Sequence, residues 1–260
     1  MVVSFKLFFW LLKLGALANL YFLGRTFTFP LASVDAEVLI PAQILFAVSA
    51  FRCLFPVRYK DNIVFHNSPL SSVFLTRLFA TFSEVALIYQ LAHIIRLLNH
   101  DQIGWVDSLS WGMVVIVVVS QIFVWGSILT GRRMLFFYEE LGWTLIYAIN
   151  TIVSAYLYAT VDNFGGREIL LQVSLFFGLV YLPWQFIHLR VLWLDARGEQ
   201  ARTKVTWNSL ARGLHQSIHL KNQTSDPKAW GGLIGVMWMT AYWATLIPMW
   251  MCLIVIINTI

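Results

Sequence analysis

Carboxylate, guanidinium and hydroxyl side chains recur at helical spacing inside long apolar stretches of this sequence. Arg77 and Glu84 are seven residues apart, which places them on one face of a helix with Thr81 between them. No basic residue is obvious at the depth of Glu84, and a buried carboxyl group without a cationic partner tends to keep its proton. The pattern therefore predicts a buried general acid at Glu84.

A second polar stripe runs through the stretch 134–160. Its members follow one another at intervals of three and four residues: Glu140, Thr144, Tyr147, Thr151, Ser154 and Tyr158. Two further stretches carry similar faces, one with Ser174, Tyr181, Gln185 and His188, the other with Trp238, Tyr242 and Thr245. Four helices are thus expected to line one polar, aromatic cavity. The pattern leaves open whether Glu84 or the pair Glu139/Glu140 supplies the acid.

Aromatic rings are the other candidate chemical groups. Trp184, Trp238 and Tyr242 fall in the middle of apolar stretches, where ring faces can stabilise a cation. An acid beside such rings is the arrangement that carbocation chemistry requires. Tryptophans near the ends of stretches, such as Trp230, are expected in interfacial belts. A purely structural ion-paired layer is the alternative role for three groups at similar depth: Arg77, Glu139 or Glu140, and His188.

The apolar stretches that hold these residues indicate a membrane protein. Hydrophobic residues make up 59% of the 260 residues and charged residues 12%, and the mean hydropathy is +0.71. About seven stretches are long enough to cross a bilayer as helices: residues 7–24, 38–55, 70–98, 108–130, 134–160, 168–194 and 231–258. The expected fold is an all-α polytopic bundle that forms one transmembrane domain over residues 1–260.

Lys and Arg in the connections predict the orientation. Most follow the second, fourth and sixth stretches, so these connections and the N-terminus are expected in the cytoplasm, with the C-terminus on the opposite side. The host membrane is expected to be the endoplasmic reticulum. Within the loop at about 196–229, Trp207, Leu210, Leu214 and Ile218 have helical spacing, which predicts an amphipathic helix on the cytoplasmic leaflet.

The sequence lacks the motifs of several classes of function. The sequence contains no HExxH, GxSxG, P-loop or CxxC motif and no clustered histidines, so no metal and no cofactor is expected. The net charge of +5 arises from the polar breaks, as membrane topology requires, and a nucleic-acid partner is not expected. The expected partners are a lipophilic small molecule, membrane lipids and enzymes of the same pathway.

One segment resembles a known family. The stretch FRCLFPVRYKDNIVFHNSPLSSVFLTRLFATFSEVALIYQ, Phe51 to Gln90, is similar to the integral-membrane terpene cyclases of fungal meroterpenoid biosynthesis, of the ascochlorin and ascofuranone type. The resemblance implies an enzyme of the isomerase or lyase type that opens the terminal epoxide of a prenylated phenol and cyclises its farnesyl chain without metal or redox cofactor. Relatives carry acids in an early and a late span, whereas the last span here has none, so the second role would pass to Glu139 or Glu140.

The resulting hypothesis gives catalytic roles to three residues and substrate contacts to five. Glu84 donates a proton to the epoxide, and Glu140, aided by Tyr147, accepts the terminating proton or orients the attacking hydroxyl. The substrate contacts are Arg77, Trp184, His188, Trp238 and Tyr242. Two other functions fit the same residues: a small proton-coupled transporter in which Glu84 carries the proton, and a non-catalytic membrane protein.

Overall fold

The computed structural model describes residues 5–29, 34–160, 167–198 and 205–258, and most of these residues are helical. The all-α prediction is confirmed. Six of the described helices are long and apolar enough to cross a membrane, which makes the chain a multi-pass membrane protein by length and composition. They are α1 (Phe5–Thr26), α2 (Ala36–Leu54), α3 (Val73–Leu98), α4 (Gly104–Thr130), α5 (Arg133–Thr160) and α6 (Glu168–Arg197).

The seventh predicted span is helical but not regular. It consists of α8 (Gly232–Met239), a π-helical segment η3 (Thr240–Leu246) and α9 (Ile247–Asn258). The N–H of Ile247 donates to the carbonyl of Tyr242, and Pro248 has no N–H to offer the next carbonyl, that of Trp243. Asn19 of α1 fills this place, because its side-chain amide donates to the Trp243 carbonyl at 3.1 Å.

The chain forms two compact units. Unit 1 comprises Met1–Ala86 and Leu214–Ile260, and unit 2 comprises Leu87–Gly213. The boundaries fall inside α3 and inside α7 (Trp207–His219), the helix that the amphipathic spacing predicts. The single domain over residues 1–260 stays a prediction.

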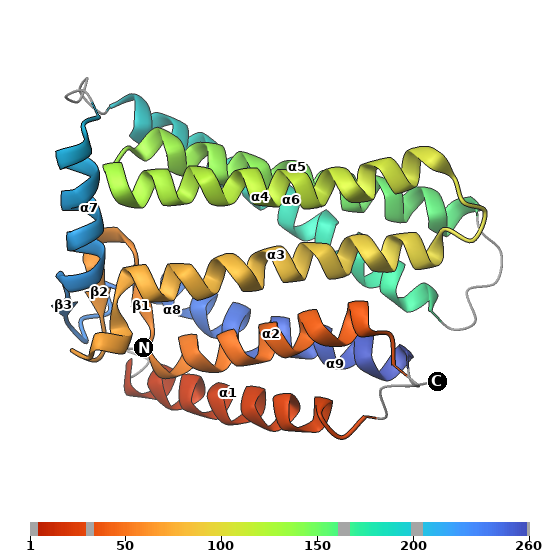
Figure 1. The fold of residues 1–260 in the computed structure, drawn as a ribbon, viewed down its shortest axis with the longest axis horizontal. Helices are drawn as coiled ribbons and strands as arrows, with labels where there is room; N and C mark the ends of the chain where they lie inside the picture. Colours follow the sequence, from red (N-terminus) through yellow and green to blue (C-terminus); the bar gives the residue numbers. More distant parts are fainter. Residues whose placement is uncertain (1–4, 30–33, 161–166, 199–204, 259–260) are drawn as a thin grey trace. The chain divides into compact units, whose positions relative to one another are not determined.

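In unit 1, α1, α2 and the segment from α8 to α9 lie side by side (Figure 1). A small sheet joins them: β1 (Val57–Arg58) pairs antiparallel with β2 (Ile63–Val64), and β2 pairs parallel with β3 (Asn222–Gln223). Two 3₁₀ turns, η1 (Lys60–Asn62) and η2 (Pro69–Ser71), complete the link from α2 to α3.

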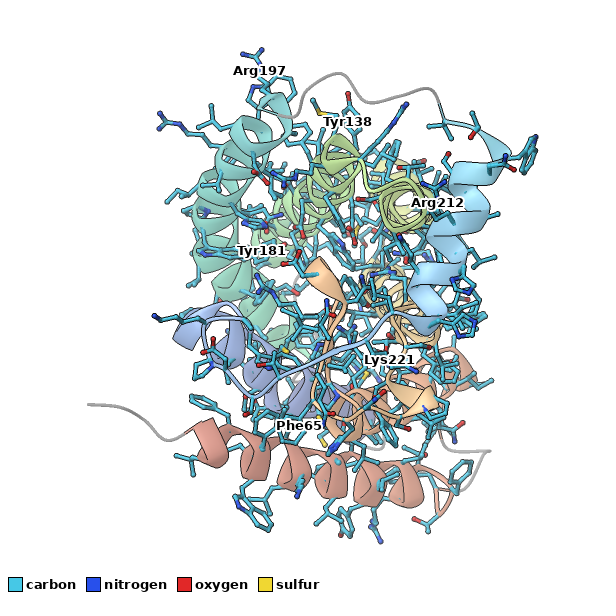
Figure 2. The ribbon with its side chains drawn as sticks, turned by 90° about the vertical axis from the view of Figure 1, so that its left-hand side faces the viewer. Phe65, Tyr138, Tyr181, Arg197, Arg212 and Lys221 are labelled. Carbon is cyan, nitrogen blue, oxygen red and sulfur yellow. The ribbon has the colours of Figure 1, made fainter. Side chains whose placement is uncertain are left out.

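Trp230 forms the centre of the core beneath this sheet. Its side chain is 1% exposed and packs with Ile63, Val236 and Phe65. Its indole N–H donates to the carbonyl of Thr224 at 2.9 Å, so the polar edge of the ring is satisfied without water. The expectation that Trp230 belongs to an interfacial belt is therefore wrong. Phe65 in turn stacks on Phe9 of α1, and Figure 2 shows it beside that helix.

Unit 2 contains α4, α5 and α6, in which α5 packs against both neighbours (Figure 1). Gly131 ends α4 in the left-handed conformation, with φ of 68°, and lets the chain turn directly into α5. The middle of the predicted stripe of α5 is buried, since Thr144, Tyr147 and Ser154 are each at most 9% exposed, whereas Tyr158 at its end is 48% exposed. The stripe packs on α6, at Gly178 in particular.

Replacing Gly178 by alanine is expected to separate α5 from α6. A Cβ at this position would overlap Oγ1 of Thr151 and lie 2.9 Å from its Cγ2, so the helices must move apart, at a cost of about 1–3 kcal/mol in the free energy of unfolding. Gly112→Ala is the matched control, because a Cβ there meets nothing within 4 Å and should leave stability unchanged or raise it by up to about 1 kcal/mol. Unfolding of both variants in detergent measures the difference. Equal stabilities would contradict the close approach of α5 to α6.

Candidate functional site

Arg77 and Glu84 form an ion pair inside α3. The two terminal guanidinium nitrogens of Arg77, Nη1 and Nη2, donate to the two carboxylate oxygens of Glu84, at 3.2 and 2.6 Å. Arg77 is 2% exposed and Glu84 is 7% exposed, so the pair is buried in the protein. The expectation that Glu84 lacks a basic partner is wrong. A guanidinium offers hydrogen-bond donors only, and both oxygens of Glu84 act as acceptors here, which is not the arrangement of a proton donor.

A second arginine in unit 1 is held by aromatic rings. The Cζ atom of Arg52, in the last turn of α2, lies 3.5 Å from the ring centroid of Trp243 and 5.8 Å from that of Tyr59. The ring of Tyr59 is also 5.8 Å from the Cζ atom of Arg77. Tyr242, predicted to contact substrate, meets Trp243 edge to face at 4.7 Å. Neither Arg52 nor Tyr59 is among the site residues that the sequence predicts.

In unit 2, Glu140 is held by an amide. Nε2 of Gln185, on α6, donates to the Glu140 carboxyl at 2.7 Å and to its backbone carbonyl at 3.1 Å. Gln185 is 0% exposed, and the two bonds together fix the rotamer of the Glu140 side chain. The neighbouring Glu139 is also buried, at 7% exposed.

A row of aromatic rings follows the same face of α6. The ring centroid of Tyr147, on α5, lies 4.8 Å from that of Tyr181 and 5.0 Å from that of Phe177. The ring centroids of Tyr181 and Trp184 are 5.9 Å apart. The rings of Trp184 and His188 are stacked, with 5.1 Å between their centroids and 9° between their planes. The row thus runs from the buried Tyr147 to Trp184 and His188, and the side chain of Trp184 is 41% exposed.

Comparisons with protein families, curated proteins and solved structures give no match. The resemblance of residues 51–90 to membrane terpene cyclases therefore stays a prediction.

The predicted site residues thus fall into two clusters, one in each unit. Arg77, Glu84 and Tyr242 belong to unit 1, and the Glu140 cluster belongs to unit 2. The side chain of Trp238 lies outside the described residues. A cavity shared by the four helices stays a prediction. Gln185, which fixes Glu140, was recognisable in the sequence as a polar residue on the face of Tyr181 and His188, although its partner was not.

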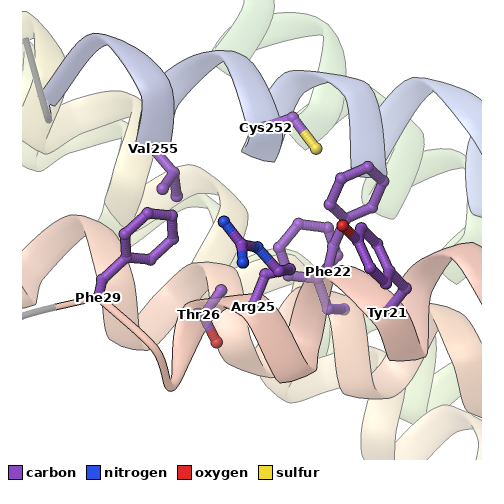
Figure 3. Close-up of a pocket in the computed structure, with 8 residues that line it drawn as sticks. Tyr21, Phe22, Arg25, Thr26, Phe29, Cys252 and Val255 are labelled. Atoms are coloured by element: carbon purple, nitrogen blue, oxygen red, sulfur yellow. The ribbon is translucent and has the colours of Figure 1, made fainter.

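A pocket of about 200 Å³ lies elsewhere in unit 1. It is bounded by α1, α2 and α9, and Figure 3 shows the guanidinium of Arg25 directed into it from α1, with Cys252 and Val255 on the helix opposite. The other lining residues are mostly apolar, namely Tyr21, Phe22, Thr26, Phe29, Phe46 and Val255. It contains none of the predicted site residues. In the described part of the chain, no three His, Cys, Asp or Glu side chains are grouped to hold a metal ion.

Proposed function

We propose that the protein is a membrane-bound, acid-initiated terpene cyclase that opens the epoxide of a prenylated aromatic substrate and cyclises its farnesyl chain. The observation that carries this proposal is the carboxyl group of Glu140, held by Gln185 on the same helices as the row Tyr147, Tyr181 and Trp184. The resemblance of residues 51–90 to such cyclases, a prediction from the sequence, agrees with it. The acid role passes from Glu84 to Glu140 because Arg77 occupies both oxygens of Glu84.

The chemistry follows from these groups. The protonated carboxyl of Glu140 donates its proton to the epoxide oxygen as the C–O bond to the tertiary carbon breaks, which leaves an alcohol and a carbocation. The π electrons of the next alkene attack the cation and form the ring bond. The final cation loses a proton to the Glu140 carboxylate, so the acid is regenerated and the reaction is an isomerisation. No oxidant, reductant or cofactor enters this balance.

The aromatic row has a separate task in this mechanism. The faces of Tyr147, Tyr181 and Trp184 stabilise the moving positive charge by cation–π attraction, worth up to about 2 kcal/mol each when water is excluded. His188 stacks on Trp184 and fixes the plane of that ring. The apolar helices around the row exclude the water that would otherwise capture the cation.

Location and partners belong to the same proposal. We expect the N-terminus in the cytoplasm and the C-terminus on the opposite side, as the distribution of Lys and Arg predicts, and we expect the host membrane to be the endoplasmic reticulum. A substrate with a farnesyl chain partitions into the bilayer and reaches the helices from the lipid phase. The enzymes that prenylate and epoxidise it would act before this protein.

The direct test is turnover by the purified protein in detergent. A farnesylated phenol with a terminal epoxide should be converted into a cyclic product of unchanged mass, detected by liquid chromatography with mass spectrometry and assigned by NMR. Chelator and the absence of nucleotide should not slow the reaction. An unchanged epoxide after incubation with folded protein, across several prenylated phenols, would contradict the proposal.

Proton-coupled transport is the second candidate, and the buried Arg77–Glu84 pair favours it. An ionisable pair within a spanning helix is costly, and in membrane proteins it commonly marks a path for ions or substrate. In this case, proteoliposomes containing the protein should accumulate a solute when a pH gradient is applied. Turnover of the epoxide in detergent, where no gradient exists, favours the cyclase instead.

A further inference from the structure

The position of Arg52 is not that of an ordinary basic residue at the end of a membrane helix. Such side chains usually extend into the aqueous phase. Arg52 instead stacks on Trp243, whose side chain is 6% exposed, with 3.5 Å between Cζ and the ring centroid. The stack covers one face of the guanidinium and leaves the N–H groups along its edges to bind acceptors.

The protein itself supplies no anion for these N–H groups. Among the described residues, Arg52 has no carboxylate within ion-pair distance, in contrast to Arg77 and Arg133. Close by, the hydroxyl of Tyr59 is buried and has no hydrogen-bond partner among the residues that the structure describes. A buried hydroxyl without a partner is destabilising, and a hydrogen-bond acceptor placed here would bind both the guanidinium and the hydroxyl.

Several features of the sequence hold the Trp243 ring in place. Gly15 allows α1 to approach η3 closely, because a Cβ there would lie only 3.0 Å from the Cα of Ala244. One turn further along α1, Asn19 donates to the Trp243 carbonyl that Pro248 leaves without a helical donor. These contacts of α1 with the backbone of η3 hold the Trp243 ring in its position against Arg52.

We propose that Arg52, Trp243 and Tyr59 form a binding site for the phosphate group of an anionic membrane lipid. A guanidinium binds phosphate through two parallel N–H bonds, and the Tyr59 hydroxyl supplies a third donor. The lipid, rather than a soluble phosphate, is the expected source because Arg52 lies in the last turn of a spanning helix, at the level where head groups lie. This site is independent of the proposed cyclase chemistry.

Native mass spectrometry of the protein in detergent, with phosphatidic acid as the probe, tests the site. Arg52→Gln should raise the dissociation constant of the most tightly bound lipid about tenfold or more, and Tyr59→Phe should raise it severalfold. Arg197→Gln is the matched control. Arg197 also stacks on a tryptophan, Trp193, at 4.5 Å, but it projects from the end of α6 (Figure 2) and its loss should leave this affinity unchanged.

The outcomes separate the site from general attraction of lipid to basic residues. Equal losses in Arg52→Gln and Arg197→Gln would overturn the proposal. Phosphatidylcholine should bind without dependence on Arg52. Displacement of the lipid by inorganic phosphate at equal concentration would overturn the lipid assignment.

Arg52→Lys is a second variant, which keeps the charge and the alkyl stem and therefore tests the site even if Arg52→Gln does not fold. It should bind more weakly than the natural protein, and full affinity in this variant would contradict recognition by the planar guanidinium.

Discussion

Replacing Glu140 by glutamine is expected to lower the rate of cyclisation by about 10²–10⁴-fold, the usual contribution of a general acid. Glutamine has nearly the same shape and can still meet Gln185, whose Nε2 lies 2.7 Å from the carboxyl oxygen, but it has no proton to donate. Initial rates with the farnesylated epoxide in detergent measure the effect. Thermal unfolding of the same preparation shows whether the variant is folded.

Glu139→Gln is the matched control for this prediction. Glu139 is the neighbouring residue and carries the same group, buried where Glu140 is half-buried, but the amide of Gln185 is bonded to Glu140. Its replacement should retain most of the activity. The reverse result, with activity lost in Glu139→Gln and kept in Glu140→Gln, would assign the acid to the other carboxyl group. Full activity in both variants would remove the carboxyl chemistry from the proposal.

The helices were predictable from the sequence because each span is long and apolar and because polar residues recur at helical intervals. The α5 stripe illustrates this, since Thr144, Tyr147 and Ser154 follow one face and are all buried. Local spacing determines which residues share a face. It does not determine what that face meets, and the contact of Thr151 with Gly178 required the packing of α5 on α6.

The ion pair is not evident from depth along the helix axis. Glu84 follows Arg77 by seven residues, about 10 Å along an α-helix, which predicts different depths for the two side chains. Side chains in a helix lean toward its N-terminus, however, so the carboxyl of Glu84 tilts toward Arg77, and the long arginine side chain covers the remaining distance.

The Arg52 cluster depended on contacts between distant parts of the chain. The ring of Trp243 reaches Arg52, 191 residues earlier in the sequence, from a helix that changes to π geometry before Pro248. Hydropathy and periodicity carry no signal for such a change. Pro248 is evident in the sequence, but the donor that replaces its missing N–H comes from Asn19 on another helix, which bonds the carbonyl of Trp243.

Arg77→Gln should destabilise the protein by about 3–5 kcal/mol, the usual cost of breaking a buried ion pair from one side. The glutamine leaves the carboxylate of Glu84 buried at 7% exposure without the guanidinium that balanced its charge. The double variant Arg77→Met with Glu84→Gln should regain most of the lost stability, because neither residue of the pair then carries a charge. Unfolding of the three proteins in the same detergent gives the free energies.

Arg133 provides the matched comparison, since its ion pair with Asp195 has the same 2.6 Å distance but both side chains are 47% exposed. Arg133→Gln should therefore cost at most about 1 kcal/mol, because solvent screens the pair and hydrates the remaining carboxylate. If the two single variants were equally stable, burial would not govern the Arg77–Glu84 pair. A double variant no more stable than Arg77→Gln would show that Arg77 acts through its other contacts, among them the ring of Tyr59, rather than by neutralising Glu84.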